Sequence, residues 1–281
     1  MKAELKTWTG LGAQLGVATA LAGLTLTGCA DEASESDDGA ATEQVGEAGE
    51  GEGVDGEGEG QGGEGEGGVN TSAASSDPVV YGSALAIAEA HVIAARDAYA
   101  AGETQAGAEM FAHPVSEVLL ELEPTFAQLG VEDLSPLFLA ASDAALIGAS
   151  AEDIAAKADS IVAALRAAEE KAPSNGASEG KIAAGVVADQ IERAVDMYGQ
   201  AADTTIYGPY LDGYGFYKAA EATYERSASV ITADDINLAK SIEDALTLLA
   251  AAYPSVERPE DLDANQGELS GASASVLLAS S

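Results

Sequence analysis

The side chains best suited to metal chemistry in this 281-residue chain are its two histidines, His91 and His113. The residues three and four positions from His91 are apolar on both sides, namely Ile87, Ala88, Ala94 and Ala95. We therefore expect the His91 ring to point into a helical bundle. His113 directly precedes Pro114, a favoured first residue of a helix, so it is predicted at a helix start with Glu117 one turn further on.

A hairpin at Gly102 would bring the two imidazoles together, because antiparallel helices joined by a short link pack side by side. Met110, Glu109 and Glu117 are then placed to complete a metal shell. Imidazole with carboxylate suits iron, zinc or copper, whereas imidazole with a thioether favours copper. The alternative is that both histidines are structural, one in the core and one at a helix end.

Tyrosines are concentrated in one segment, since six of the nine lie between Tyr198 and Tyr224. A tyrosine buries its ring and keeps a hydroxyl for polar partners, so such clusters often line grooves. On this interpretation Tyr210, Asp212 and Tyr214 form a second wall of the metal pocket. The alternative is that these tyrosines pack the core of a domain with few other aromatic residues.

The sequence contains no recognisable catalytic pattern. Its one cysteine, Cys29, belongs to an N-terminal processing signal, so no thiol remains for catalysis. No nucleophile turn accompanies either histidine, and no glycine-rich phosphate loop follows a strand. We therefore predict that the protein is not an enzyme.

Residues 1–28 have the layout of a bacterial lipoprotein signal peptide. Lys2 and Lys6 precede an apolar run, and a small residue, Gly28, stands before Cys29. We predict cleavage before Cys29 and lipid attachment to its thiol, which would anchor the mature chain to a membrane outside the cytoplasm. Ala30, in place of an aspartate, favours the outer membrane over the inner one. The alternative is an ordinary signal peptide with an incidental cysteine.

Residues 29–76 are predicted to form a disordered tether. Residues 30–76 include 14 acidic residues and no basic or aromatic one, with repeated Gly-Glu pairs. Such a segment buries too little apolar surface to offset its conformational entropy. A plain spacer is favoured over weak capture of cations, because glutamates on a flexible chain do not preorganise a coordination shell.

Residues 77–263 are predicted to form an all-α domain, an antiparallel bundle of about seven to eight helices. Alanine is abundant and alternating β-branched residues are nearly absent. The expected helices cover 84–101, 104–112, 114–129, 134–148, 150–171, 178–198, 210–228 and 232–253. Ser150, Ser178 and Thr232 are the expected N-terminal caps. Residues 264–281 are predicted to be a polar, flexible tail.

The domain is strongly acidic, with 33 acidic and 10 basic residues from Asp77 onward. This charge argues against nucleic acid as a partner, because phosphates attract Lys and Arg. It also argues against electrostatic docking on anionic lipid, which leaves the lipid on Cys29 as the predicted membrane contact. The charge suits binding of cations, and it equally suits solubility in a salty medium.

Two parts of the chain resemble a pattern in extracytoplasmic helical domains. The first begins at His91 and has Tyr-x-x-Gly at 99–102, His-Pro-x-x-Glu at 113–117 and Leu-x-Pro at 122–124. The second has Tyr-x-x-Ala at 198–201 and Tyr-x-Asp-x-x-Gly-Phe at 210–216, similar to helical domains attached to iron permeases and to imelysin-like proteins. The Gly-x-His-x-x-Glu motif of imelysin is absent, because position 94 is Ala. The resemblance implies a bundle that handles metal, chiefly iron, outside the cytoplasm, with a metal permease or another envelope protein as partner.

Together these features predict an extracytoplasmic lipoprotein whose helical domain binds a transition metal for uptake or storage, with iron favoured over copper and zinc. The alternative is a non-catalytic interaction or structural lipoprotein without a metal site.

Overall fold

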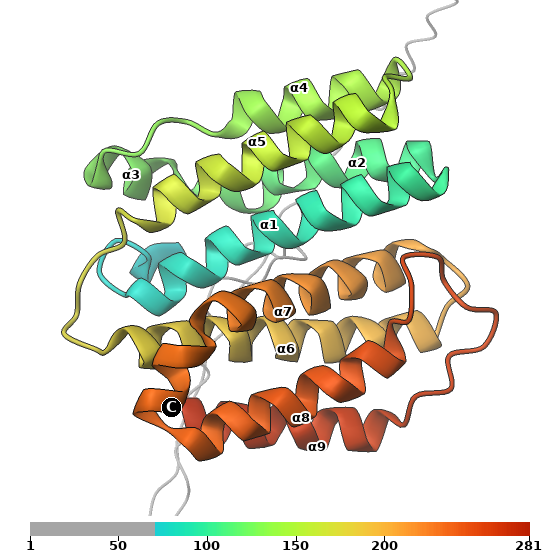
Figure 1. The fold of residues 1–281 in the computed structure, drawn as a ribbon. Helices are drawn as coiled ribbons and strands as arrows, with labels where there is room; N and C mark the ends of the chain where they lie inside the picture. The colour runs from blue at the N-terminus through green and yellow to red at the C-terminus, as the bar shows by residue number, and fades with distance from the viewer. Residues whose placement is uncertain (1–70) are drawn as a thin grey trace, which may run out of the picture. The chain divides into compact units, whose positions relative to one another are not determined.

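The computed structural model describes residues 71–281, and every regular element in this part of the chain is a helix (Figure 1). The elements are the 3₁₀ helix η1 (Thr71–Ala73), α1 (Pro78–Ala101), α2 (Thr104–Pro114), the π-helix η2 (Val115–Leu119), α3 (Leu120–Leu129), α4 (Ser135–Leu146), α5 (Ala151–Glu169), α6 (Glu179–Ala202), α7 (Gly208–Asp234), α8 (Ile236–Ala252) and α9 (Gln266–Ser280). Because α2, η2 and α3 follow one another without a break, they form one continuous helical segment. The predicted all-α fold is confirmed for residues 71–281. The predicted signal peptide, Cys29 and residues 30–70 of the predicted tether lie outside the described residues.

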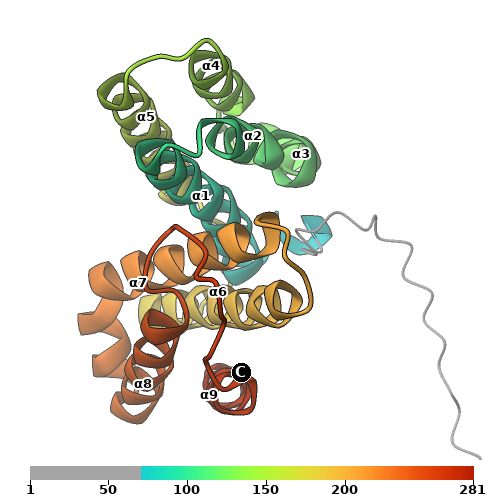
Figure 2. The same cartoon turned by 90° about the vertical axis from the view of Figure 1, so that its right-hand side faces the viewer.

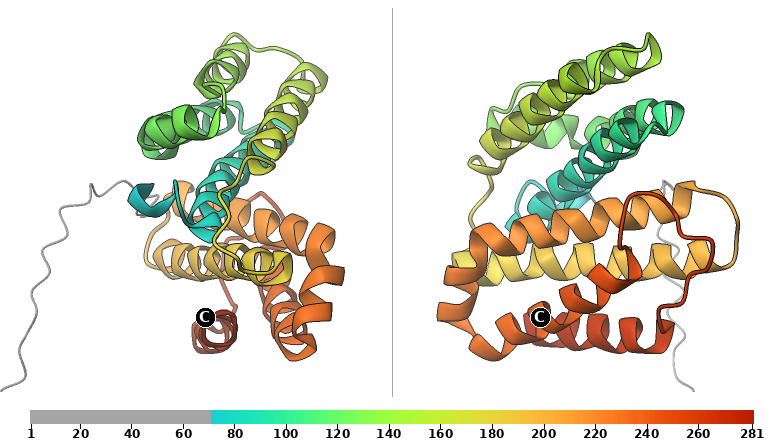
Figure 3. Two further views of the ribbon diagram at one scale, coloured as in Figure 1. Left: turned by 90° about the vertical axis from the view of Figure 1, so that its left-hand side faces the viewer. Right: turned by 45° about the vertical axis from the view of Figure 1, so that its right-hand side comes forward.

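Helix α1 lies between two groups of helices (Figures 1 and 2). Helices α2 to α5 pack on one side of it, and α6 to α9 form the other group, of which α6 and α7 contact α1 directly (Figure 3). Eighteen of the 24 residues of α1 are buried, as expected for a helix covered from several sides. By length and composition α1 could cross a membrane, but 83% of its most apolar stretch is buried inside the fold. Its apolar character therefore matches its place in the core.

Glycines allow two helices to approach α1 closely next to His91. A Cβ added at Gly107 of α2 would lie 2.8 Å from the carbonyl oxygen of Ala95, and one added at Gly215 of α7 would lie 2.5 Å from that of Ala90. Real Cβ atoms do not come so near a backbone oxygen, so a larger residue would push the helices apart. These two contacts set the spacing at which side chains of α2 and α7 reach those of α1.

Side-chain capping explains where several helices begin, and two of the three predicted caps are confirmed. The hydroxyls of Ser150 and Ser178 each accept a hydrogen bond from the backbone N–H three residues further on. The third predicted cap, Thr232, is wrong, because α7 continues past it and Asp235 caps α8. The Asp235 carboxylate accepts from two backbone N–H groups, and its extended backbone (φ −150°, ψ 105°) ends α7 at this residue.

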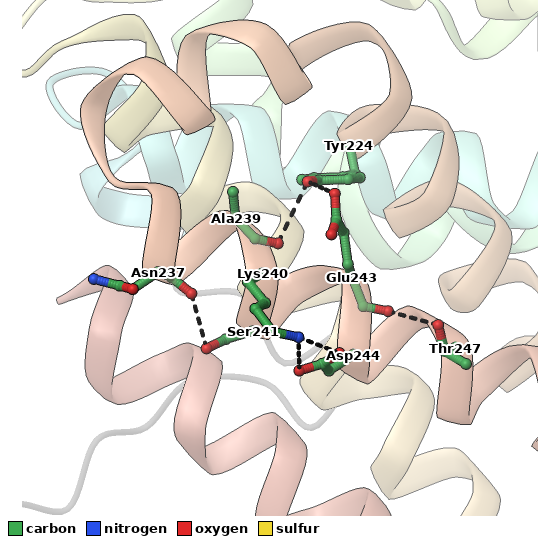
Figure 4. Close-up of polar contacts among 8 residues, drawn as sticks. All are labelled: Tyr224, Asn237, Ala239, Lys240, Ser241, Glu243, Asp244 and Thr247. Atoms are coloured by element: carbon green, nitrogen blue, oxygen red, sulfur yellow. Dashed lines mark hydrogen bonds and ion pairs between the residues drawn. The ribbon is translucent and has the colours of Figure 1, made fainter.

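Polar contacts fix the packing of α8 on α7 (Figure 4). The buried hydroxyl of Tyr224 lies 3.3 Å from the carbonyl oxygen of Ala239 and 2.8 Å from Glu243 Oε1. On the exposed side of α8, Lys240 pairs with Asp244 one turn later at 2.9 Å. The tyrosine ties two helices together, whereas the exposed ion pair acts within a single helix and is worth only a few tenths of a kcal/mol.

The N-terminal boundary of the folded part lies earlier than predicted. Residues 71–76, assigned above to the tether, include η1, and Ala74 is fully buried against the core. Thr71 Oγ1 donates a hydrogen bond to Glu121 Oε2 at 3.2 Å. The acidic composition ends before this point, so the small residues of 71–76 are able to pack.

The predicted flexible C-terminal tail is wrong, since residues 266–280 form helix α9. Asn265 caps it by accepting hydrogen bonds from the N–H groups of Gly267 and Glu268. Leu269, Ser273 and Val276 are buried, and α9 packs on α6 and α8. The buried residues are spaced four and three apart, so they form a narrow apolar stripe that the many serines and glycines obscure in the sequence.

Candidate metal centre

Four ionisable side chains from α1, α2, η2 and α7 meet beside the centre of α1. His91 Nε2 lies 3.4 Å from Glu117 Oε2 and 3.8 Å from Asp212 Oδ1. His113 Nδ1 lies 3.8 Å from Glu117 Oε1, and the centroids of the two imidazole rings are 5.9 Å apart. The short Gly102 turn places α2 beside α1, as the hairpin interpretation required: Gly102 has φ 100° and its N–H reaches the carbonyl oxygens at the end of α1.

The dimensions of this group fit a transition metal ion. Two ligand atoms bound to one ion at about 2.1 Å lie at most about 4.2 Å apart. The three nitrogen–oxygen distances of 3.4 and 3.8 Å satisfy this limit. His91, His113 and Asp212 offer ligand atoms that all lie within 4.8 Å of one another, slightly beyond this limit.

The hydrogen bonding of His91 determines which of its nitrogens faces the other ligands. Nδ1 lies 2.8 Å from the carbonyl oxygen of Ile87, and because a carbonyl only accepts, we assign the proton to Nδ1. The lone pair of a neutral ring is then on Nε2, which faces Glu117 and Asp212. A backbone carbonyl that accepts the second ring N–H is the usual arrangement for a metal-bound histidine, because it fixes the tautomer and the ring orientation.

Burial makes a positive charge necessary at this position. The His91 side chain is 5% exposed, Glu117 is 17% exposed and Asp212 is 12% exposed. Two carboxylates and a lone pair repel one another strongly where water is largely excluded. A cation between them, either a proton on an imidazole or a metal ion, removes that repulsion.

His113 provides the side of the centre that is open to solvent. Its side chain is 39% exposed, whereas that of Glu117 is 17% exposed. Within the described part of the chain, its Nδ1 atom is itself buried and has no hydrogen-bond partner. The Nδ1 atom of His113, which could ligate a metal ion, therefore faces inward, toward Glu117.

The helix that carries Glu117 changes its winding just before this residue. The prediction that His113 stands at a helix start is wrong: His113 lies in the last turn of α2, and Pro114 lies inside the helical segment. Proline has no N–H to donate, so the regular hydrogen bonding is interrupted there. The chain continues as the π-helix η2, Val115–Leu119, and single π-turns within α-helices frequently occur at functional sites.

Asp212 belongs to α7. It lies directly beside His91, whereas the sequence pattern predicted it in a second wall of the pocket together with Tyr210 and Tyr214. Of the three predicted wall residues it alone contacts this group in the described structure. The hydroxyl of Tyr210 donates to the carbonyl oxygen of Ser255 at 2.7 Å, and that of Tyr214 donates to Asp97 Oδ2 at 2.8 Å. Burial raises the pKa of Tyr210 to about 12, so its hydroxyl stays protonated and acts as a hydrogen-bond donor. The core-packing alternative therefore describes Tyr210 and Tyr214.

The other two residues of the predicted shell have different surroundings. Met110 is 3% exposed and packs in the hydrophobic core. Glu109 is exposed, and its carboxylate accepts a hydrogen bond from Gln105 at 2.6 Å. The donor set that converges is therefore two imidazoles and two carboxylates.

An aromatic ring packs against His91, and a charged pair packs against that ring. Phe216, one turn after Asp212 on α7, packs edge-on against His91 with ring centroids 5.8 Å apart. The guanidinium of Arg193 lies 5.9 Å from the Phe216 ring and pairs with Asp189 at 3.0 Å. This packing holds the His91 ring in one orientation, which a ligand geometry requires.

Comparisons of the chain with protein-family models, with curated proteins and with solved structures find no match. The function is therefore argued from the geometry of this centre.

Proposed function

We propose that the protein binds one transition metal ion through His91, His113, Glu117 and Asp212. The observation that carries the proposal is the orientation of His91, whose Nε2 lone pair faces two largely buried carboxylates while its Nδ1 proton is held by a backbone carbonyl. A second imidazole lies 5.9 Å away between ring centroids. His91, His113 and Asp212 offer ligand atoms that lie within 4.8 Å of one another, and Glu117 approaches both histidines, a combination of donor types that matches protein metal sites.

Iron is the metal that this donor set favours. Two histidines with carboxylate ligands and open positions are the usual protein site of non-haem iron(II). Thiolate or thioether ligands would instead favour copper(I), and Met110 packs in the core. Zinc uses the same donor types in tetrahedral geometry and is the main competitor.

The proposed biological role is uptake or storage of this metal outside the cytoplasm by a lipoprotein anchored through Cys29. The support for the anchor is the N-terminal sequence, Leu26 to Cys29, which lies outside the described residues. The described residues hold a single group of this type, which binds one ion per chain. One accessible ion per chain suits capture and transfer to a partner such as a permease better than bulk storage.

Titration calorimetry and thermal melting of the metal-free protein test the proposal. We expect one equivalent of iron(II) to bind, and a hundredfold excess over Kd to add about 2.7 kcal/mol to the unfolding free energy. For a domain of this size that raises Tm by roughly 5–10 °C. His113→Ala and Asp212→Asn should weaken binding at least tenfold, and acidification to about pH 5 should do the same because a protonated imidazole cannot ligate.

Glu109→Gln is the matched control, because it removes a carboxylate of the same helix as His113 that points away from the centre. Its affinity should stay within about twofold of the original protein. If iron, copper and zinc all leave Tm unchanged, or if Glu109→Gln weakens binding as much as Asp212→Asn, the metal proposal fails. The interaction-lipoprotein alternative then becomes the better explanation of the fold.

A further inference from the structure

A second feature, lined by residues other than those of the metal centre, is a cavity of about 530 Å³. It lies between α1, the end of α5, α6 and α7. Its volume lies in the range of small-molecule binding sites, roughly 300–1,000 Å³. One wall is apolar and includes Ile182 and Val186 of α6 and Val230 of α7. The lining also includes the charged residues Arg166, Arg226, Glu169, Glu170 and Glu179, so the cavity is amphipathic.

The two arginines that line the cavity differ in the number of carboxylates with which they pair. Arg166 donates to the buried Glu89 and also pairs with Glu169 at 3.1 Å. Arg226 Nη2 lies 3.6 Å from Glu169 Oε2, the same oxygen that Arg166 contacts. Burial and the neighbouring Arg166 lower the pKa of Arg226, although Glu89 and Glu169 act in the opposite direction, so its charge is only partly compensated. An additional anion beside Arg226 would stabilise that charge.

A hydroxyl with no partner adjoins this charge. Thr223, one turn before Arg226 on α7, lines the cavity and is 3% exposed. Within the described residues its Oγ1 atom is buried and makes no hydrogen bond. A buried hydroxyl without a partner is destabilising, so it is a position where a ligand acceptor atom would be stabilised.

We propose that this cavity binds a small amphipathic molecule with a carboxylate head, which Arg226 and Thr223 hold while the apolar part lies on Ile182, Val186 and Val230. The guanidinium offers paired N–H donors that match the two oxygens of a carboxylate. The Thr223 hydroxyl donates to one of those oxygens. This site is independent of the metal centre, and it does not rest on the proposed function.

Glu169 accounts for how an anion enters a site on an acidic protein. Its side chain is 41% exposed and it contacts Arg226 at the long distance of 3.6 Å, so it can turn into solvent when a ligand carboxylate arrives. Arg166 keeps Glu89 as its buried partner. The exchange replaces one carboxylate beside Arg226 with another, gives up the exposed pair of Glu169 with Arg166, and adds the hydrogen bond to Thr223 and the apolar contacts.

The test uses three probes with the same six-carbon chain, namely hexanoate, hexylammonium and hexanol, titrated into the metal-free full-length protein by calorimetry. We expect hexanoate to bind with Kd of about 1 mM, a usual strength for a ligand of so few atoms. Hexanol and hexylammonium should bind at least tenfold more weakly. Arg226→Gln should weaken hexanoate binding at least tenfold, and Thr223→Val, which keeps the side-chain shape, should weaken it about three- to tenfold.

Two control variants separate this site from general charge effects and from the metal centre. Lys240→Gln removes one positive charge from an exposed ion pair on α8 (Figure 4) and should leave hexanoate binding within twofold. His113→Ala should also leave it unchanged. The proposal is overturned if hexanoate does not bind at 10 mM, if hexylammonium binds as tightly, or if Thr223→Val and Lys240→Gln have the same effect. Because Thr223→Val preserves volume, it remains informative even if Arg226→Gln fails to fold.

Discussion

His91 combines a fixed tautomer with a buried position, and this combination gives the centre its chemistry. The Ile87 carbonyl holds the Nδ1 proton at 2.8 Å, and Phe216 packs against the ring. Nε2 faces Glu117 and Asp212, so a cation at this position, either a proton on the ring or a metal ion, would be stabilised by both carboxylates.

Glu89 is the buried acid of α1 that lies outside the metal centre, and it should give the fold a distinct pH dependence. Burial raises its pKa, although Arg166 and Arg226 act in the opposite direction. As the pH falls, Glu89 therefore takes up its proton at a higher pH in the folded state than in the unfolded state, where the pKa of a glutamate is about 4.3. This difference in proton binding contributes to the free energy of unfolding. The contribution is fully present below about pH 4.3 and is lost as the pH rises through the pKa of Glu89 in the folded state.

The expected result concerns the unfolding free energy of the original protein minus that of Glu89→Gln. This difference should become more positive from pH 7 to pH 4, by about 1.4 kcal/mol for each unit by which the folded pKa exceeds the unfolded one. Urea unfolding at pH 7, 5.5 and 4 measures it, with the exposed Glu123→Gln as the control. A difference that stays constant over this range would contradict the assignment.

At the scale of elements, the π-turn η2 is the element that carries Glu117. Glu117 lies one turn after His113, a spacing that also brings side chains together in a regular α-helix. Each residue of an α-helix turns the chain by about 100°, so a change of winding moves later side chains relative to the neighbouring helices. Pro114 cannot supply the N–H that a regular helix requires, and we attribute to the winding that follows it the direction of Glu117 toward His91.

Pro114→Ala should therefore stabilise the helix and weaken the metal centre. The new N–H allows regular winding, which would rotate Glu117 away from His91, so iron affinity should fall at least tenfold while Tm stays equal or rises. Pro124→Ala is the matched control, because Pro124 is also inside this helical segment and lies in α3, beyond the centre. Calorimetry and thermal melting of both variants decide the matter. Equal loss of affinity in the two variants would exclude a specific role for η2.

At the scale of the whole described fold, the centre links the two groups of helices. His91, His113 and Glu117 belong to α1 and the segment that follows it, whereas Asp212 belongs to α7 in the other group (Figure 2). An ion bound by all four would connect the two groups across α1. Binding should therefore slow any opening motion that separates α7 from α1.

Hydrogen exchange should detect this connection. With iron at a hundredfold excess over Kd, exchange through such openings should slow by up to about a hundredfold in α1, α2 and α7. In Asp212→Asn the protection should persist near His91 and His113 and be lost in α7. Protection confined to α1 and α2 in the original protein would show that Asp212 is not a ligand.

The anchor is tested at the same scale. Since Cys29 is the only cysteine of the chain, Cys29→Ala should move the protein from the membrane fraction to the soluble fraction. The melting temperature of the helical part should stay within about 2 °C, because the described core begins beyond residue 70. Membrane association that persists in Cys29→Ala would refute the lipoprotein prediction.

Local sequence determined the helices, because their signals are local. Alanine-rich periodicity, the serines at 150 and 178 and the turn at Gly102 fix most helix positions from neighbouring residues alone. The same signals led to the pairing of His91 with His113 and Glu117, which lie close in sequence. Where local signals were weak, the predictions were wrong: α9 has a narrow apolar stripe among serines, and Asp235 is a stronger cap than Thr232.

Tertiary structure alone decided which distant side chains join the centre. Asp212 is 121 positions from His91, and its contact depends on the close approach of α7 to α1 that Gly215 permits. The winding of η2 is likewise a compromise between Pro114 and packing on both sides, which no local preference predicts. The cavity beside Arg226 exists only because α5, α6 and α7 leave space at α1. Such features depend on the distances between packed helices, and a sequence specifies these distances only through the complete set of contacts in the core.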